Sequence, residues 1–92
     1  MAVQCALFTT GIVVITPNAL GQLTPADIQI GLQRHQAGDW GDLGEEDWKE
    51  NDQALRTGFR LLSSYRSAGG VPFWIITEAD RRSTTLLLPD DY

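Results

Sequence analysis

The sequence predicts one α+β domain over residues 1–92, with short helices packed on one face of an antiparallel sheet in the order β-α-α-α-β-β-β. Three observations support this prediction. The first half of the chain carries two Thr-Pro helix starts, the hydrophobic period changes from helical to alternating after Gly58, and tight turns join the last three apolar stretches. A chain of 92 residues with 42% hydrophobic content can build one core and is too short for two domains.

The first apolar stretch, residues 7–15, becomes β-branched toward its end and predicts a strand that stops at the following Thr-Pro pair. Thr16 can cap a short helix over residues 17–23, with proline at its first position. Thr24 repeats this signal and predicts a second helix over residues 25–35.

The strongest helix signal covers residues 45–57, after a connection rich in glycine and aspartate. Acidic residues fill its first turn, Trp48 and Leu55 share one stripe, and Gly58 suits the position just after the helix.

Three strands then follow in close succession. Alternation predicts strands over residues 59–66, 71–78 and 84–88, connected by a hairpin loop at residues 67–70 and a turn at residues 79–83. The two short connections make these strands an antiparallel meander.

The acidity of the chain is local. The formal net charge is −5, yet the segment from Asp39 to Asp52 alone holds seven carboxylates and one lysine, so the rest of the chain is close to neutral. Such a band can steer a basic protein partner, or it can be the solvated start of a helix. The candidate partner-binding residues are Asp39, Trp40, Asp42, Glu45, Glu46, Asp47 and Glu50.

Trp40 lies in the turn between two predicted helices, where a large aromatic either fills the space beneath the loop or anchors a partner. Gly41 favours the first interpretation, because glycine lets the backbone fold closely over the ring.

His35 is the only histidine of the chain. It could form an acid–base pair with Asp39, but no nucleophile motif accompanies it, and a histidine that stabilises the end of a helix is the favoured interpretation. A different hypothesis is a toxin-like ribonuclease that uses His35, Arg60, Tyr65 and Arg66. The negative net charge opposes this hypothesis, because RNA is a polyanion.

Cofactor, metal and membrane functions have little support in the sequence. The segment 39–50 half-matches a calcium-binding loop, but Gly41 and Leu43 stand where two oxygen ligands are needed. The longest apolar run, residues 12–15, is far too short to cross a bilayer. The sequence starts without the basic residues of a secretory signal, and its single cysteine, Cys5, suits a reducing cytoplasm. We therefore expect a cytoplasmic protein with no cofactor and no bound metal.

Several motifs together resemble a family of short uncharacterised proteins that plasmids and other mobile elements carry, the "plasmid-related" proteins. The resemblance covers residues 13–92. It includes the run GDWGDL at residues 38–43, the run WIITEADR at residues 74–81, and the ending TTLLLP at residues 84–89. It implies a cytosolic single domain without an established activity, for which accessory or anti-defence roles are plausible. The chain departs from the family pattern at Arg82 and at residues 11–15.

These observations predict a non-enzymatic protein-binding module of a mobile element, with anti-CRISPR or anti-restriction activity as the leading form. In that hypothesis the acidic band docks onto a basic nucleic-acid channel, so that carboxylates replace phosphates. The alternatives are the ribonuclease and a homodimeric accessory protein formed by edge pairing of residues 86–88. We expect no direct contact with nucleic acid or membrane, and either a monomer or a homodimer.

Overall fold

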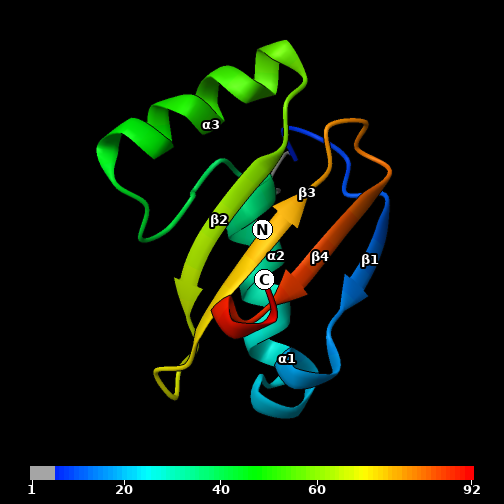
Figure 1. Ribbon diagram of the computed structural model, residues 1–92, viewed down its shortest axis with the longest axis vertical. Helices are drawn as coiled ribbons and strands as arrows, with labels where there is room; N and C mark the ends of the chain where they lie inside the picture. Colours follow the sequence, from blue (N-terminus) through cyan, green and yellow to red (C-terminus); the bar gives the residue numbers. More distant parts are fainter. Residues whose placement is uncertain (1–5) are drawn as a thin grey trace, which may run out of the picture.

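The computed structural model describes residues 6–92, and Cys5 lies outside the described residues. It contains a four-stranded sheet, three α-helices and a C-terminal 3-10 turn (Figure 1). The elements are β1 (Ile12–Ile15), α1 (Pro17–Gln22), α2 (Pro25–Gln36), α3 (Glu45–Thr57), β2 (Leu61–Arg66), β3 (Pro72–Thr77), β4 (Ser83–Leu87) and η1 (Pro89–Asp91). The α+β class and the order β-α-α-α-β-β-β are confirmed.

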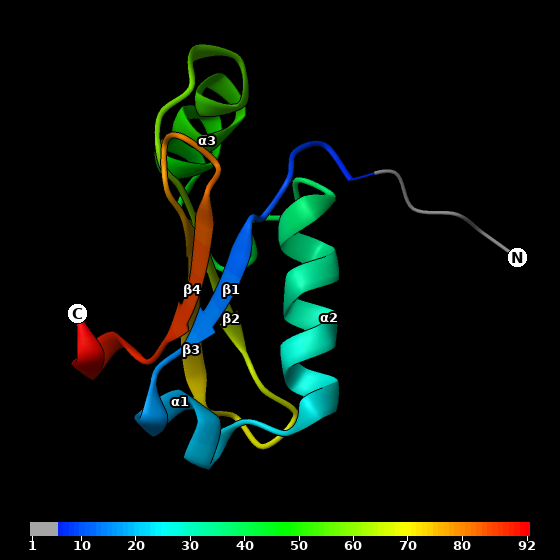
Figure 2. The same ribbon diagram turned by 90° about the vertical axis from the view of Figure 1, so that its right-hand side faces the viewer.

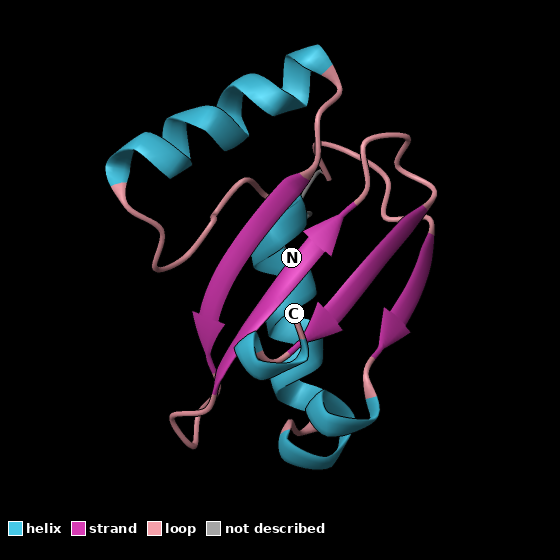
Figure 3. Ribbon diagram, viewed as in Figure 1, coloured by secondary structure: helices cyan, strands magenta, loops and turns pink. Residues whose placement is uncertain are grey.

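The strands lie in the order β1-β4-β3-β2 (Figure 3). β2, β3 and β4 form the predicted antiparallel meander, whereas β1 pairs with β4 in parallel, so the sheet is mixed. No short turn fixes the direction of β1 against β4, because most of the chain separates them. β4 is an interior strand between β1 and β3, so the predicted edge at residues 86–88 is wrong. The true edges are β1 and β2.

The predicted helix starts are built from side-chain caps. The Thr16 hydroxyl accepts a hydrogen bond from the amide of Ala19 at 3.1 Å. At the start of α2, Thr24 accepts from the amide of Asp27 at 3.1 Å, and the Asp27 carboxylate accepts from the amide of Thr24 at 2.9 Å. These reciprocal bonds satisfy amides that the helix itself leaves without partners.

α2 covers one face of the sheet (Figure 2). The main core lies between them and contains Tyr65, Phe73, Ile75 and Leu86, all nearly inaccessible to solvent. Gly31 permits this close approach, because a Cβ at this position would lie 3.0 Å from the Phe73 ring.

α3 does not lie on that face. It lies beyond one end of the sheet, next to β2 (Figures 1 and 2). A second core there buries Trp40, Ala54 and Leu61, with Trp48 and Leu55 packed partly against them. The acidic segment is therefore attached to the molecule through its own small core.

Among residues 6–92, no α-helix covers the opposite face of the sheet (Figure 2). The C-terminal turn lies on this side, away from α2 (Figure 2). The Trp74 and Tyr92 rings meet edge to face there, with centroids 5.7 Å apart. With Arg60, Leu62 and Ile76 they line a shallow pocket of about 250 Å³.

Candidate functional site

The sequence-predicted site lies on the loop after α2 and on the first two turns of α3. Helical periodicity turns Trp48, Asn51, Ala54 and Leu55 toward the protein, where they are buried or half-buried. The carboxylates of the same helix are exposed to solvent. The exposed acidic residues of this region are Asp42, Glu45, Glu46, Asp47, Glu50 and Asp52.

Asp39 is half-exposed, but its carboxylate is held by an ion pair and by a backbone amide. Its carboxylate accepts two hydrogen bonds from Arg34, at 2.7 and 3.2 Å, and one from the amide of Gly41 at 3.1 Å. The Arg34 guanidinium lowers the pKa of Asp39 below its ordinary value, and the Gly41 amide adds to the effect. Arg34 thus offsets the charge of Asp39 within the chain, and the assignment of Asp39 as a partner-binding residue stays a prediction.

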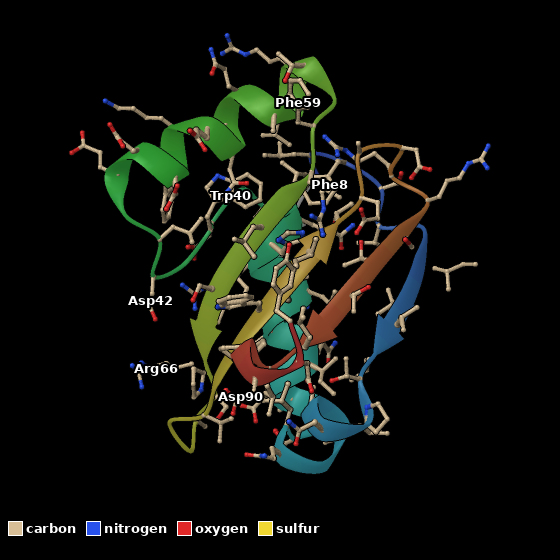
Figure 4. The ribbon with its side chains drawn as sticks, in the orientation of Figure 1. Phe8, Trp40, Asp42, Phe59, Arg66 and Asp90 are labelled. Atoms are coloured by element: carbon tan, nitrogen blue, oxygen red, sulfur yellow. The ribbon has the colours of Figure 1, made fainter. Side chains whose placement is uncertain are left out.

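Trp40 is completely buried and cannot anchor a partner. Its indole N–H donates to the Asp52 carboxylate at 3.0 Å, and its ring stacks on Phe8 with centroids 6.3 Å apart. In Figure 4 Trp40 lies between α3 and β2, whereas Asp42 points outward from the loop. The interpretation of Trp40 as a residue that fills the space beneath the loop is confirmed, and its assignment as a partner-binding residue is corrected.

The close approach at Gly41 explains why the tryptophan is held there. Gly41 has a φ of +77°, and a Cβ on it would lie 2.0 Å from the Ser64 carbonyl oxygen. The Ser64 amide donates to the Trp40 carbonyl at 3.1 Å, and the Asp42 amide donates to the Ser64 carbonyl at 2.7 Å. The loop thus forms a short parallel bridge with β2 and holds the acidic segment in place.

Few positive charges within the domain pair with the remaining carboxylates. Glu45 forms an exposed ion pair with Lys49, one helical turn further along α3, with 3.5 Å between Glu45 Oε1 and Lys49 Nζ. Within residues 6–92, no ion pair engages Asp42, Glu46, Asp47 or Glu50. The exposed carboxylates of α3 and its preceding loop, which we call the acidic face, therefore keep a negative potential.

His35 lies in a buried polar network that the sequence did not indicate. Its Nδ1 contacts the Ser63 hydroxyl, and its Nε2 contacts Thr77 Oγ1 at 2.8 Å. Thr77 Oγ1 in turn contacts Thr84 Oγ1 at 2.7 Å, and Thr84 donates to the Thr10 carbonyl at 2.8 Å. His35, Ser63, Thr77 and Thr84 are all fully buried.

The chain of hydroxyl donors fixes a proton on Nε2 of His35. Because Thr84 gives its one proton to the Thr10 carbonyl, Thr77 must donate to Thr84 and accept from His35 Nε2. Nε2 therefore carries a proton, and because burial keeps His35 neutral, Nδ1 is the acceptor in its contact with Ser63. Burial lowers the pKa of His35 to about 3, with a further contribution from the charge of Arg81. A neutral histidine does not stabilise the end of a helix by charge, so that interpretation is corrected.

The residues of the ribonuclease hypothesis do not meet. His35, on α2, and Tyr65, on β2, are both buried; the Tyr65 hydroxyl donates to the Asp39 carbonyl at 2.6 Å, and burial raises the pKa of Tyr65. Arg60 lies against Glu78 at 3.2 Å beside the pocket of the open face. Arg66 lies at the opposite end of β2, about 20 Å from Arg60 along an extended strand (Figure 4).

Arg81 has a structural role that the sequence did not reveal. Its guanidinium donates to the carbonyls of Phe59 at 2.7 Å, Glu78 at 3.1 Å and Ala54 at 3.0 Å. These bonds tie the turn after β3 to the carboxyl end of α3, where helix carbonyls lack partners. The Arg81 guanidinium therefore has a structural role, with its N–H groups bonded to three backbone carbonyls.

Asn51 is a second residue whose structural role was not predicted from the sequence. Its side-chain amide donates to the Leu62 carbonyl at 2.7 Å and accepts from the Leu62 amide at 3.0 Å. It pairs with the outer edge of β2 as a neighbouring strand would. A signal was present, because a polar residue stands within the buried stripe between Trp48 and Ala54.

Residues 6–92 contain no group of three or more histidine, cysteine, aspartate or glutamate side chains that could hold a metal ion. The calcium-loop half-match also ends within a helix, because residues 45–50 are the start of α3. No helix in the described part of the chain is both long and apolar enough to cross a membrane. Comparisons with protein-family models, curated proteins and solved structures find no match.

Proposed function

We propose that this protein is a non-enzymatic docking module whose acidic face binds a basic surface of another protein. The observation that carries the proposal is the exposure of Asp42, Glu46, Asp47 and Glu50 without an ion pair among the described residues. Uncompensated charges of one sign steer and orient a partner of the opposite sign.

The placement of α3 supports a role in docking. The helix lies beyond the end of the sheet, and Glu46 and Glu50, one turn apart, face away from its buried stripe. Trp40, Asn51 and Arg81 fix the helix to the domain through buried or charge-assisted hydrogen bonds. A rigidly held charged surface loses less conformational entropy on binding than a mobile one.

The partner that we propose is a nucleic-acid-handling complex of the host, with a CRISPR–Cas complex or a restriction enzyme as the leading class. Such proteins present arginine and lysine grooves for phosphates, and a row of helical carboxylates fits the same groove. The resemblance to plasmid-borne proteins motivates this choice, since a mobile element gains from blocking host defence.

An affinity experiment at two salt concentrations tests the proposal. The immobilised protein is incubated with a bacterial lysate, and the captured proteins are identified by mass spectrometry at low and at high salt. We expect a nucleic-acid-handling protein at low salt, its loss at high salt, and its displacement by added duplex DNA. Recovery of no such protein at low salt would reject the proposal.

A matched pair of variants separates the acidic face from total charge. Glu50→Lys and Asp90→Lys change the net charge equally, but Asp90 lies on the C-terminal turn, far from α3 (Figure 4). We expect Glu50→Lys to lose the captured partner and Asp90→Lys to retain it. Equal losses in both variants would show that overall charge, and not this surface, determines binding.

A further inference from the structure

The two edges of the sheet differ in how far they are closed. On β2 the outward backbone groups of Leu62 pair with Asn51, and those of Ser64 pair with the Trp40–Asp42 loop. Closing an edge in this way prevents other strands from pairing with it. β1, at the other edge, has no comparable cover among the described residues.

β1 is also strongly apolar and open to solvent. The exposed fractions are 73% for Ile12, 40% for Val13 and 46% for Val14. The amides of Ile12 and Thr16 donate to carbonyls of Arg82 and Leu86 on the β4 side, at 2.9 and 3.0 Å. Because alternate residues of a strand face opposite neighbours, the backbone groups of Val13 and Ile15 face outward.

This spacing is self-complementary. Two antiparallel copies of β1 can pair so that Val13 of each copy bonds with Ile15 of the other, which places Val14 opposite Val14 on a two-fold axis. The paired residues are β-branched at every position from 12 to 16, the type that packs best across neighbouring strands.

The charges at the two ends of β1 are opposite in sign, and antiparallel pairing of two copies brings them together. Arg82 is exposed beside the Ile12 end and makes no ion pair within residues 6–92. Asp91 lies at the other end, where the Thr16 hydroxyl donates to its carboxylate at 2.7 Å. Antiparallel pairing brings the Arg82 end of each copy beside the Asp91 end of the other, twice in one dimer.

We propose that a second copy of this chain docks on β1, forming a symmetric dimer with one continuous sheet across the two-fold axis. Two short strands bury less surface than the roughly 1,200 Å² typical of stable complexes. The dimer is therefore concentration-dependent and, through Arg82 and Asp91, weakened by salt. This inference does not depend on the acidic face, because that face lies on α3, next to β2, and β1 is at the other edge of the sheet.

Sedimentation over micromolar to millimolar concentrations tests the proposal. We expect the wild type to shift from monomer to dimer, and Val14→Lys to remain monomeric because two lysines would meet on the axis. Val14→Thr keeps the β-branched shape and should dimerise. A mixture of Val14→Lys and Val14→Glu should recover the dimer, a result that a mere folding defect cannot give. A wild type that stays monomeric throughout, or a mixture that stays monomeric, would overturn the proposal.

Cross-linking tests the register in a Cys5→Ser background. Val14→Cys should form a disulfide-linked dimer on mild oxidation, because facing residues on the axis lie within disulfide distance. Val13→Cys is the control and should not cross-link, since Val13 faces Ile15 of the other copy. Cross-linking of the Val13→Cys variant in preference to Val14→Cys would overturn this register.

Discussion

Acidification should destabilise the protein at a pH where its carboxylates are still charged, because His35 is neutral when folded. The folded-state pKa of His35 is about 3, against an ordinary value of 6.5. Below pH 6.5 the unfolded chain binds a proton that the folded chain does not, so stability falls as the pH falls toward about 3. Linkage gives a loss of about 2 kcal/mol between about pH 7.5 and about pH 5, with a limiting slope of about 1.4 kcal/mol per pH unit.

The assay is urea unfolding followed by tryptophan fluorescence at several pH values in this range. The chain has one histidine, so the slope can be assigned to a single side chain. His35→Gln is the control, because its amide can still donate toward Thr77 but does not titrate. This variant should be less stable at neutral pH and nearly independent of pH down to about pH 5.

The reasoning fails if the wild type and His35→Gln lose stability equally over this range. A direct measurement guards against a variant that does not fold. Nitrogen-15 NMR of the wild-type imidazole should show the neutral form with the proton on Nε2 at about pH 5. A charged ring in the folded protein at that pH would refute the proposed proton arrangement.

Two further predictions concern how α3 and its loop are held against β2. Asn51→Ala should lower the unfolding free energy by about 2 kcal/mol or more, because both backbone groups of Leu62 lose their partner. Asn51→Asp keeps the acceptor for the Leu62 amide but places a buried carboxylate oxygen against the Leu62 carbonyl, so it should be no more stable than Asn51→Ala in urea unfolding. Gly41→Ala should destabilise the protein several-fold more than Gly58→Ala, whose cost is about 1 kcal/mol. Both glycines have positive φ, but only at Gly41 would a Cβ meet backbone. Equal costs in thermal unfolding would contradict the importance of close packing at Gly41.

Local signals in the sequence were sufficient for the helices and for the meander. Thr16 and Thr24 form their caps with residues at most three positions away, and Gly58 ends α3 at a φ of 82°. Such features depend on a few neighbouring residues, so the sequence carries them in full. The direction of β1 depends on a partner strand about 70 residues away. The apolar pattern of β1 does not indicate whether it pairs with that strand in parallel or antiparallel.

The sequence was enough to locate the acidic segment, but not to say which of its residues are exposed and free of internal partners. The concentration of carboxylates between Asp39 and Asp52 is a property of the sequence, and most of them are exposed. Tertiary contacts changed the role of two of these residues. Arg34 folds back onto Asp39, and the indole of Trp40 enters the core beside Phe8.

The His35 network could not be read from the sequence for a related reason. Alternation places Ser63 on the face of Leu61 and Tyr65, and Thr84 on the face of Leu86, but nothing in the sequence indicates that either hydroxyl joins a network with His35. Their burial follows from the closeness of α2 to the sheet, which is a property of packing.

The pairing of Asn51 with Leu62 gives α3 a spectroscopic reporter of its own attachment. In a sheet, an amide is usually protected from hydrogen exchange by a neighbouring strand, but the amide of Leu62 is protected by a side chain from a helix. Whenever α3 detaches from the rest of the domain, this amide exchanges with deuterium while amides between β3 and β4 stay protected. Its exchange rate therefore measures how often the acidic helix leaves the body of the molecule.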